Sequence, residues 1–284
     1  MQTDQRRFRP AERRRRLALI IAVSLLSVTV LCFLPPIPLG PGYHDFTDRR
    51  IFLQIPNYLD VLSNIPFMIV GLWGLLWLLR RSSKPSFAIQ QERIPYFVFF
   101  AGVALTGAGS FWYHMAPGNS RLPWDLMPMT CSFLSILASI IMERISVKAG
   151  LRVLLPLLVL GIASVAYWYL TERQDHGDYR FYLFVQFFPP LLIALIIALF
   201  PPRYTGTHYL AVAFIFFVLA KLFELFDKQI YLFTHMISGH SLKHITAGAA
   251  CYWILRMLQK RRALPGLGED GTNQSLLDYR RQTV

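Results

Sequence analysis

The sequence predicts an all-α membrane protein, a bundle of seven transmembrane helices with one additional transmembrane helix at the amino terminus. Of its 284 residues, 54% are hydrophobic and only 16% are charged, whereas about a quarter of the residues in a soluble domain carry a charge. Apolar stretches of the length that crosses a bilayer, about 20 residues, recur along the whole chain. No room is left for a separate soluble domain.

Eight apolar stretches are expected to form the spans, with turn-forming proline, glycine and serine between them. They cover residues 17–34, 59–79, 94–115, 124–142, 151–170, 181–200, 208–226 and 240–258. We expect residues 1–40 to form a basic cytoplasmic segment with the extra anchor, 41–260 the seven-helix domain, and 261–284 a disordered polar tail.

The first stretch could instead be a cleaved signal peptide, because basic residues precede it. Its apolar run is long, and no A-x-A-like cleavage site follows it. Both features favour a retained anchor, and the other seven spans keep the same orientation in either case.

The net charge of +13 would suit a nucleic-acid-binding protein, but most of the basic residues flank apolar stretches. At such positions lysine and arginine set membrane topology and contact anionic lipid, so we expect no nucleic-acid partner. Their distribution places both termini in the cytoplasm, and the short loops suit a bacterial inner membrane. The two main groups are Arg6, Arg7, Arg9 and Arg13 to Arg16, and then Arg256, Lys260, Arg261 and Arg262.

Two short motifs place ionisable groups at membrane depth, where they are costly and indicate function. Ser110 and His114 are four residues apart and share one face of the third span. His240 and His244 are also four residues apart, at the start of the last span. This spacing brings two imidazoles to one metal, although an isolated H-x-x-x-H is a weak signal.

The predicted topology strengthens the prediction of a metal site. The third span ends near His114, the fourth begins near Asp125, and the eighth begins at His240. All of these residues are therefore expected at the outer end of the bundle. Three neutral imidazoles with one open position form the ligand set of a catalytic zinc. Asp125 could then act as a general base or proton shuttle, and Ser110 could donate a hydrogen bond to a developing oxyanion.

Other interpretations stay open at this point. The histidines could sit at the interface, Asp125 could cap a helix after Pro123, and Ser110 could bond to its own helix. Four further histidines are expected to be surface or interfacial residues: His44, His176, His208 and His235.

Three charged residues are expected level with the metal site. Glu224 and Asp227 could orient a ligand histidine or could be solvated residues at a helix end. Lys243 lies inside the H-x-x-x-H motif, close to a divalent cation, and we expect it to point away or to extend toward lipid headgroups.

A second candidate metal site lies in the outer segment before the second span. Asp45, Asp48 and Asn57 are followed by Asp60, Ser63 and Asn64, and clustered oxygen ligands of this kind could bind calcium. An ordinary polar loop is the alternative, because Arg49 and Arg50 are close by.

The motifs GSFWYHM, WDLMPM and HSLKHITAG resemble the signature of the alkaline ceramidases. That family belongs to the CREST superfamily of seven-span membrane hydrolases, together with the adiponectin/progestin receptors. The resemblance extends from Tyr43 to Leu258. Its motifs are specific in combination, with S-x-x-x-H, D and H-x-x-x-H in the expected order and on the matching spans.

The resemblance implies zinc held by His114, His240 and His244, with Ser110 and Asp125 supporting hydrolysis of a sphingolipid amide to a free base and a fatty acid. It also implies a calcium site in the outer segment, where Asp45 and Asp48 match two acidic ligands. Arg50 stands where an asparagine is expected and Asn57 where a glutamate is expected, so the calcium site departs from the family pattern.

We therefore expect a zinc-dependent amide hydrolase acting on a ceramide-like membrane lipid at the non-cytoplasmic face. The alternatives are hydrolysis of another lipid amide or ester, and a receptor-like protein with a structural zinc. An ion or proton transporter would need polar residues throughout the depth of the membrane, whereas here they gather at one end.

Overall fold

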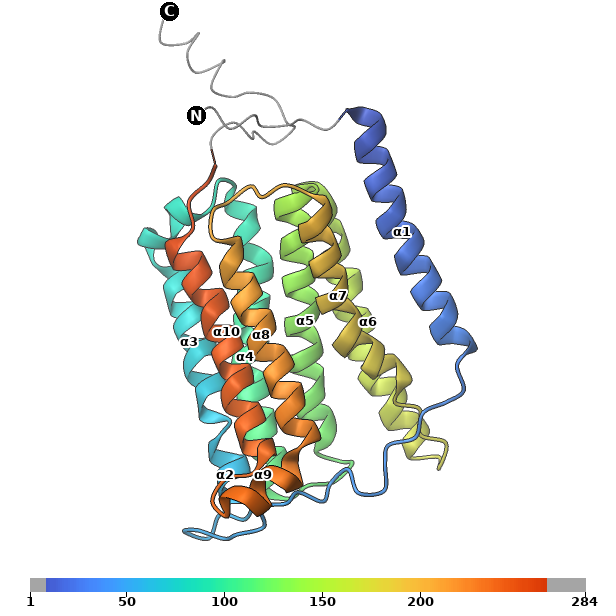
Figure 1. Ribbon diagram of the computed structural model, residues 1–284, viewed down its shortest axis with the longest axis vertical. Helices are drawn as coiled ribbons and strands as arrows, with labels where there is room; N and C mark the ends of the chain where they lie inside the picture. Colours follow the sequence, from blue (N-terminus) through green and yellow to red (C-terminus); the bar gives the residue numbers. More distant parts are fainter. Residues whose placement is uncertain (1–8, 265–284) are drawn as a thin grey trace, which may run out of the picture.

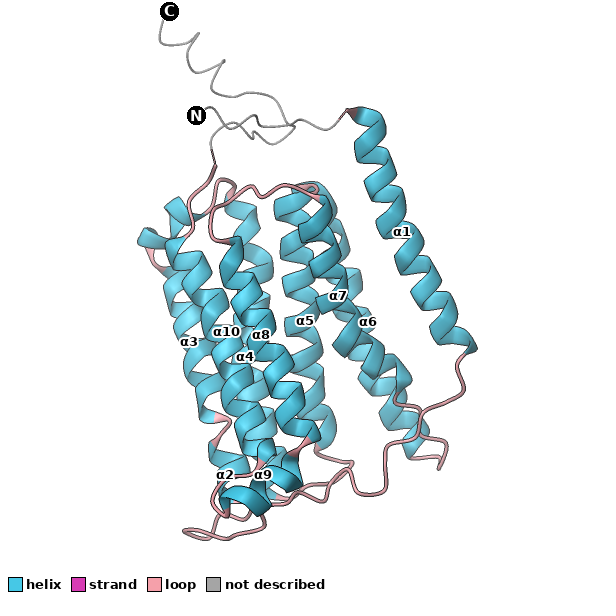
Figure 2. Cartoon of the chain, in the orientation of Figure 1, coloured by secondary structure: helices cyan, strands magenta, loops and turns pink. Residues whose placement is uncertain are grey.

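The computed structural model describes residues 9–264, and helices joined by loops account for all of this part of the chain, without a β-strand (Figure 2). Its α-helices are α1 (Pro10–Phe33), α2 (Tyr58–Leu62), α3 (Ile65–Leu79), α4 (Arg93–Met115), α5 (Leu122–Arg144), α6 (Val147–Glu172), α7 (Arg180–Leu199), α8 (Thr207–Leu225), α9 (Asp227–Thr234) and α10 (Gly239–Lys260). Two short 3₁₀ helices, Arg81–Ser86 and Gln90–Glu92, lie between α3 and α4.

Seven helical segments in the described part of the chain are long and apolar enough to cross a membrane: α1, α2 together with α3, and each helix from α4 to α8. The last helix, α10, is less apolar because it carries His240, Lys243, His244 and Arg256. It nevertheless runs beside α8 and α3 along the height of the bundle (Figure 1). The prediction of an all-α, multi-pass membrane protein is confirmed.

The bundle is built around α4 and α5, which pack on each other more extensively than any other pair of helices in the described chain. Helix α10 packs mainly on α8, α6 packs on α5, and α3 packs on α4. Helix α1 stands at the edge of the bundle (Figure 1) and buries only Ile20 and Leu31, because its main contact is with α7. Most of its surface is left for lipid.

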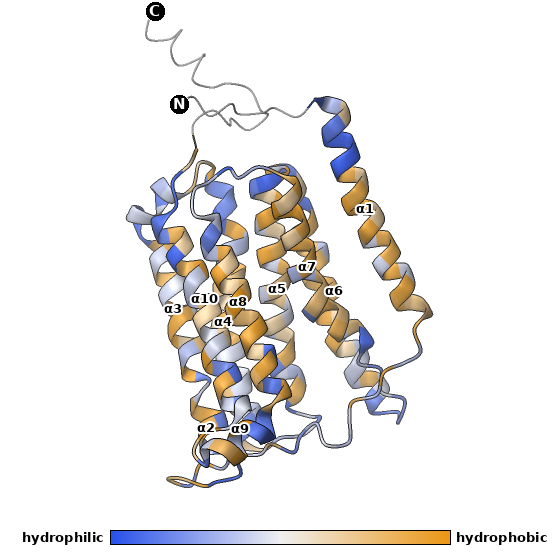
Figure 3. Ribbon diagram, viewed as in Figure 1, coloured by the Kyte–Doolittle hydropathy of each residue, from blue (hydrophilic) through white to orange (hydrophobic). Residues whose placement is uncertain are grey.

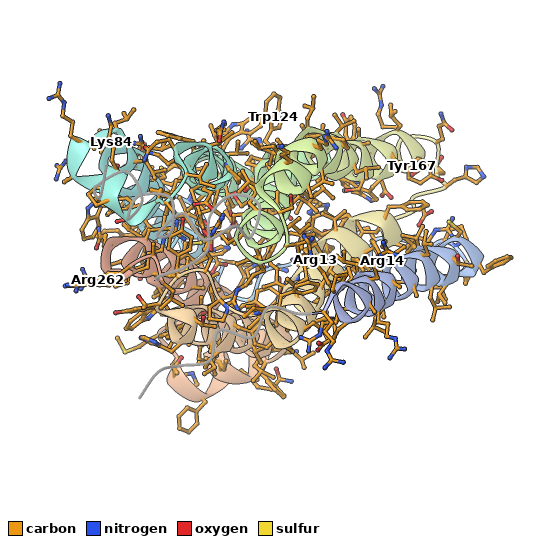
Figure 4. The ribbon with its side chains drawn as sticks, turned by 90° about the horizontal axis from the view of Figure 1, so that it is seen from above. Arg13, Arg14, Lys84, Trp124, Tyr167 and Arg262 are labelled. Carbon is orange, nitrogen blue, oxygen red and sulfur yellow. The ribbon has the colours of Figure 1, made fainter. Side chains whose placement is uncertain are left out.

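The polar residues of the helices gather at the two ends of the bundle, with an apolar band between them (Figure 3). Helix α1 begins and α10 ends at the same end, and α2 and α9 lie at the opposite end (Figure 1). The view onto the first end shows Lys84 and Arg262 at its margin, and Arg13 and Arg14 beside α1 (Figure 4). The exposed side chains of Trp124 and Tyr167 point outward from the bundle in the same view.

The second span is interrupted, although the sequence predicts an unbroken helix over 59–79. Helix α2 ends at Leu62 and α3 begins at Ile65. Pro66 explains the break, because proline has no N–H to bond the carbonyl of Leu62, four residues earlier. The interruption turns Ser63 and Asn64 into the bundle, where both are buried.

Two elements at the α2 and α9 end have no counterpart in the predicted spans. Helix α9 follows α8 after a bend at Phe226, and the segment 34–57 runs beneath the bundle from the end of α1 to the start of α2 (Figure 1). We call segment 34–57 the strap. Its backbone is tied to the start of α7 by a 2.7 Å hydrogen bond from the Tyr179 N–H to the Ile37 carbonyl.

A buried ionic network holds the opposite end of the bundle together. Arg261 is 3% exposed and is paired with Glu143 of α5, and Arg203 is paired with Glu92 at 2.9 Å. Arg261 follows the last span, as expected, but it is buried in the bundle, so the expectation that it contacts anionic lipid with its basic neighbours was wrong. Of the tail predicted over 261–284, residues 265–284 lie outside the described part of the chain.

Candidate metal centre

His114, His240 and His244 meet at the α2 and α9 end of the bundle. Each offers one imidazole nitrogen to a group of atoms that all lie within 4.8 Å of one another, and the Nε2 atoms of His114 and His240 are 3.3 Å apart. The three side chains are 1%, 9% and 3% exposed. Buried imidazoles with their nitrogens turned toward one another could hold a metal ion, as the sequence predicts.

Helix packing brings the histidines together. His114 lies in the last turn of α4, and His240 and His244 occupy one face of the first turns of α10. Gly239 allows α10 to begin close to α8 and α9, because a Cβ atom at this position would lie 2.1 Å from the Phe223 carbonyl oxygen. A larger residue here would require the start of α10 to shift relative to α8 and α9.

Ser63, in the break between α2 and α3, orients His244. The Ser63 hydroxyl lies 3.1 Å from the Asp60 carbonyl, to which it donates, and 2.8 Å from His244 Nδ1. A serine hydroxyl has one proton, so when it donates to this carbonyl its oxygen accepts from Nδ1–H of His244. In this arrangement the proton of His244 is on Nδ1, and Nε2 is free to bind a metal.

The start of α10 is held by Asp60 of α2. One oxygen of the Asp60 carboxylate accepts hydrogen bonds from the hydroxyls of Ser238, at 2.9 Å, and Ser241, at 2.5 Å. Ser238 also caps the helix by accepting from the Ser241 N–H. Ser238 is of a residue type that favours the start of a helix, but the sequence carries no sign of its contact with Asp60.

The strap covers the centre on its loop side. Phe46 is 7% exposed, and the centre of its ring lies 4.4 Å from that of His114 and 4.5 Å from that of His240. Thr47 donates a 2.7 Å hydrogen bond to Asp227, which in turn accepts one of 2.7 Å from the backbone N–H of His240. Asp227 thus links the strap to the first turn of α10. It accepts its hydrogen bond from the backbone of His240 and not from the imidazole ring.

Ser110 and Asp125 lie beside the histidines, on α4 and α5. Both are buried, and their side chains interact with each other. Gly109 makes this possible, because a Cβ atom there would lie 2.0 Å from the Trp124 carbonyl oxygen. The residue that caps α5 is Arg121, so the alternative role of Asp125 as a capping residue was wrong. One Asp125 oxygen, Oδ1, is buried without a hydrogen-bond partner in the described protein.

A cavity of about 630 Å³ opens from the centre into the bundle. Ser110, Asp125 and His244 line it at one end, and Thr207 and Ile254 line it toward the other. Most of the wall between them is apolar and comes from α4, α5, α7, α8 and α10. Tyr179 lines it near the strap, and burial raises the pKa of its hydroxyl well above the ordinary value, so it stays neutral.

Lys243 and Glu224 form an ion pair between α10 and α8. The Lys243 Nζ lies 3.0 Å from Glu224 Oε1, and the other carboxylate oxygen is 2.7 Å from Lys221 Nζ. All three residues line the cavity. Because Lys243 is paired with Glu224 inside the bundle, the alternative that it extends toward lipid headgroups was wrong. Glu224 bonds two lysines, and none of its hydrogen bonds within the described chain goes to a ligand histidine.

The residues of the possible calcium site make other contacts. Arg50 donates hydrogen bonds to both oxygens of Asp48, at 2.8 and 2.7 Å, and Asp48 raises the pKa of Arg50. Asp45 is paired at 3.1 Å with Arg49, and the Asn57 amide donates to the His114 carbonyl. Asp45 and Asp48 therefore belong to a loop that is stabilised by ion pairs with arginines. Asn57 instead supports the end of α4 beside the metal centre.

Among the other histidines, His44 differs from the expected surface residues. It is half-buried, with its two ring nitrogens 2.7 Å from the Tyr113 hydroxyl and from Asn119 Oδ1. It therefore fastens the strap to the end of α4. His176, His208 and His235 are exposed, as expected.

No known protein-family model matches the chain, and no curated protein matches it. The residues and geometry of the centre are therefore the basis for a function.

Proposed function

We propose that the protein is a zinc-dependent hydrolase of lipid amides, with a ceramide-type N-acyl lipid as the simplest substrate. The observation that carries this proposal is a group of three buried histidines, one of which, His244, lines the end of a long apolar cavity. A structural metal in a membrane bundle needs no cavity, whereas a reaction on a lipid needs one.

The spacing of the ligand atoms supports zinc. Two nitrogens bound at 2.0–2.1 Å to a tetrahedral zinc lie about 3.3 Å apart, and the Nε2 atoms of His114 and His240 are separated by 3.3 Å. Three histidine ligands leave a fourth position for chemistry. Zinc in this site would supply a Lewis acid that polarises a carbonyl and activates water.

Ser110 and Asp125 are the residues suited to act on the amide. Asp125 is buried with one oxygen unbonded, so its carboxylate can take a proton from water and deliver it to the leaving nitrogen. The Ser110 hydroxyl can donate a hydrogen bond to the carbonyl oxygen as negative charge develops there. Both side chains line the cavity beside His244.

The rest of the cavity suits an acyl chain. Thr207 and Glu224 of α8 both line it, and their separation of 17 positions along the helix corresponds to about 25 Å at 1.5 Å per residue. That length is close to the hydrocarbon thickness of a bilayer, about 30 Å. A lipid chain can therefore lie along the cavity with its amide at the histidines.

The resemblance of the three motifs to the alkaline ceramidases supports the same reaction. The basic residues at the end where α1 begins and α10 ends favour that end as the cytoplasmic one. This orientation places the metal centre at the non-cytoplasmic face, and a bacterial inner membrane suits the short loops.

The test combines metal analysis with hydrolysis. Protein purified in a neutral detergent should contain about one zinc per chain, and it should release fatty acid from a labelled N-acylsphingosine. His240→Ala should lose both zinc and activity, whereas His208→Ala, an exposed histidine at the far end of α8, should keep both. Full hydrolysis by the His240→Ala protein would refute the proposal.

A further inference from the structure

Three charged side chains form a cluster on the wall of the cavity beside the metal centre. Lys221 and Glu224 lie three residues apart on α8, and Lys243 reaches Glu224 from α10. Each Glu224 oxygen receives one lysine, at 2.7 and 3.0 Å. We call these residues the lysine cluster.

Structural support accounts for only part of this cluster. The pair between Lys243 and Glu224 joins two helices, and one pair is enough to do so. Lys221 lies on the same helix as Glu224, so their ion pair does not join α8 to another helix. Lys221 adds only a second positive charge to the cluster. Its Nζ lies 5.5 Å from the centre of the Phe187 ring of α7. A charge at membrane depth is costly and indicates a function.

The cluster has unused hydrogen-bond donors that face the cavity. A lysine ammonium has three N–H groups, and the contact with Glu224 uses one from each lysine. The side chains of Lys221, Lys243 and Glu224 are 25%, 19% and 36% exposed. Two lysines and one glutamate also leave one positive charge unbalanced within the cluster.

The cluster is close to the reacting end of the cavity. Lys243 adjoins His244 in the chain and interacts electrostatically with all three histidines. Both lysines interact with Asp125, which contributes the negative charge on the α5 wall. A group bound by the cluster would therefore belong to the head of the lipid, next to the amide, and not to its acyl chain.

We infer that the lysine cluster binds an anionic group, a carboxylate or a phosphate, on the head of the substrate. The preferred substrate is then an N-acyl lipid with an acidic head, such as an N-acyl amino acid or an N-acyl phosphoethanolamine. This inference rests on the proposed function for the amide bond, but the preference for an anion is a property of binding and can be measured without turnover.

The test uses three lipids with the same dodecanoyl chain: N-dodecanoylglycine, N-dodecanoylethanolamine phosphate and the neutral N-dodecanoylethanolamine. Their dissociation constants are measured with metal-free protein in a neutral detergent, so that hydrolysis does not interfere. We expect one or both acidic lipids to bind at least about tenfold more tightly than the neutral one, as hydrogen bonds to charged groups allow. The first two lipids distinguish a carboxylate site from a phosphate site.

Lys221→Met is the decisive variant, because it removes one positive charge and leaves the ion pair between α8 and α10 in place. It should lose most of the preference for acidic lipids without weakening the binding of the neutral lipid. Lys228→Met is the matched control, since Lys228 is exposed on α9 and is not among the described residues that line the cavity. Glu224→Gln, which adds net positive charge, should bind acidic lipids more tightly.

Equal binding of acidic and neutral lipids, or equal effects of Lys221→Met and Lys228→Met, would overturn the inference. Failure of the proposed function gives a different result. In that case the zinc-loaded protein would hydrolyse neither N-acylsphingosine nor any of the three lipids, while the binding preference and its loss in Lys221→Met would remain. If the neutral lipid is hydrolysed with the highest kcat/KM and Lys221→Met has no effect, the proposed function survives and the lysine cluster has no role in recognition.

Discussion

The hydroxyl of Ser63 lies 2.8 Å from His244 Nδ1, although 181 residues separate them in the chain. The contact exists because the second span breaks after Leu62 and turns Ser63 toward α10. It determines which nitrogen of His244 faces His114 and His240. The geometry of the metal centre thus depends on a helix that contributes no ligand to it.

Ser63→Ala is expected to weaken metal binding about 10- to 100-fold, the usual effect of removing a partner that orients a ligand histidine. The affinity can be measured by titration against a zinc chelator. Ser135→Ala is the control, because Ser135 is a buried serine of α5 whose hydroxyl bonds its own helix. Wild-type affinity in the Ser63→Ala protein would show that this hydrogen bond does not orient His244.

Asp60→Ala should destabilise the protein, because Asp60 accepts hydrogen bonds from two serines at the start of α10. The loss of two hydrogen bonds to a charged group costs about 3–6 kcal/mol. The measurement is thermal unfolding in detergent, followed by intrinsic fluorescence. Asp45→Ala removes only the exposed pair with Arg49 and should leave the unfolding temperature unchanged, since exposed pairs contribute little. Equal unfolding temperatures for the two variants would contradict this prediction.

Asp125→Asn should abolish most of the hydrolysis without removing the metal. The variant keeps the size of the side chain but cannot transfer protons, so kcat should fall by about 10²- to 10⁴-fold. Zinc content, measured in the same preparation by mass spectrometry, should stay at the wild-type value. Parallel loss of zinc and activity would instead give Asp125 a role in holding the metal.

Ala213→Phe tests whether the cavity holds the acyl chain. Ala213 of α8 is buried and lines the cavity, so a phenyl ring there takes up space that a long chain needs. The value of kcat/KM should fall about tenfold or more for a long-chain lipid and much less for a short-chain one. Ile215→Phe is the control, because Ile215 lies on the same helix and is exposed to lipid. Equal losses for both chain lengths would place the acyl chain elsewhere.

Calcium should have no effect on the protein. The oxygens of Asp48 are already bonded to Arg50, and a calcium site would need them for the ion. Titration with calcium chloride should therefore give no heat of binding and no change in unfolding temperature or zinc-dependent activity. Saturable binding that Asp48→Asn removes would show that calcium displaces Arg50.

The sequence was sufficient to predict the spans and the convergence of the three histidines. Each apolar stretch corresponds to helix in the structure, although α1 begins at Pro10 and not at residue 17, because its four arginines continue the helix beyond the apolar stretch. The histidines could be placed together because the direction of a span fixes the end at which a residue lies. The number of spans between two motifs is enough to show whether they lie at the same end of the bundle.

The contacts around the ligands could not be predicted in the same way. The bonds of Ser63 to His244 and of Asp60 to Ser238 join residues that are far apart in the chain, and neither hydrophobic periodicity nor spacing carries that information. Pro66 was a visible signal for the break in the second span. The position of Lys243 depended on Glu224 of a neighbouring helix, so its sequence context alone gave the wrong orientation.

The ring of Phe46 against two of the ligand histidines has a consequence for the kinetics of metal exchange. A hydrated cation cannot cross the apolar cavity, and on the other side the strap closes the way to water. Detachment of segment 34–57 from Asp227 and from the end of α4 would open a direct route for a metal ion. The half-life of a bound ion would be set by the rate of that opening and not by affinity alone, so purified protein would retain the metal that it met while folding.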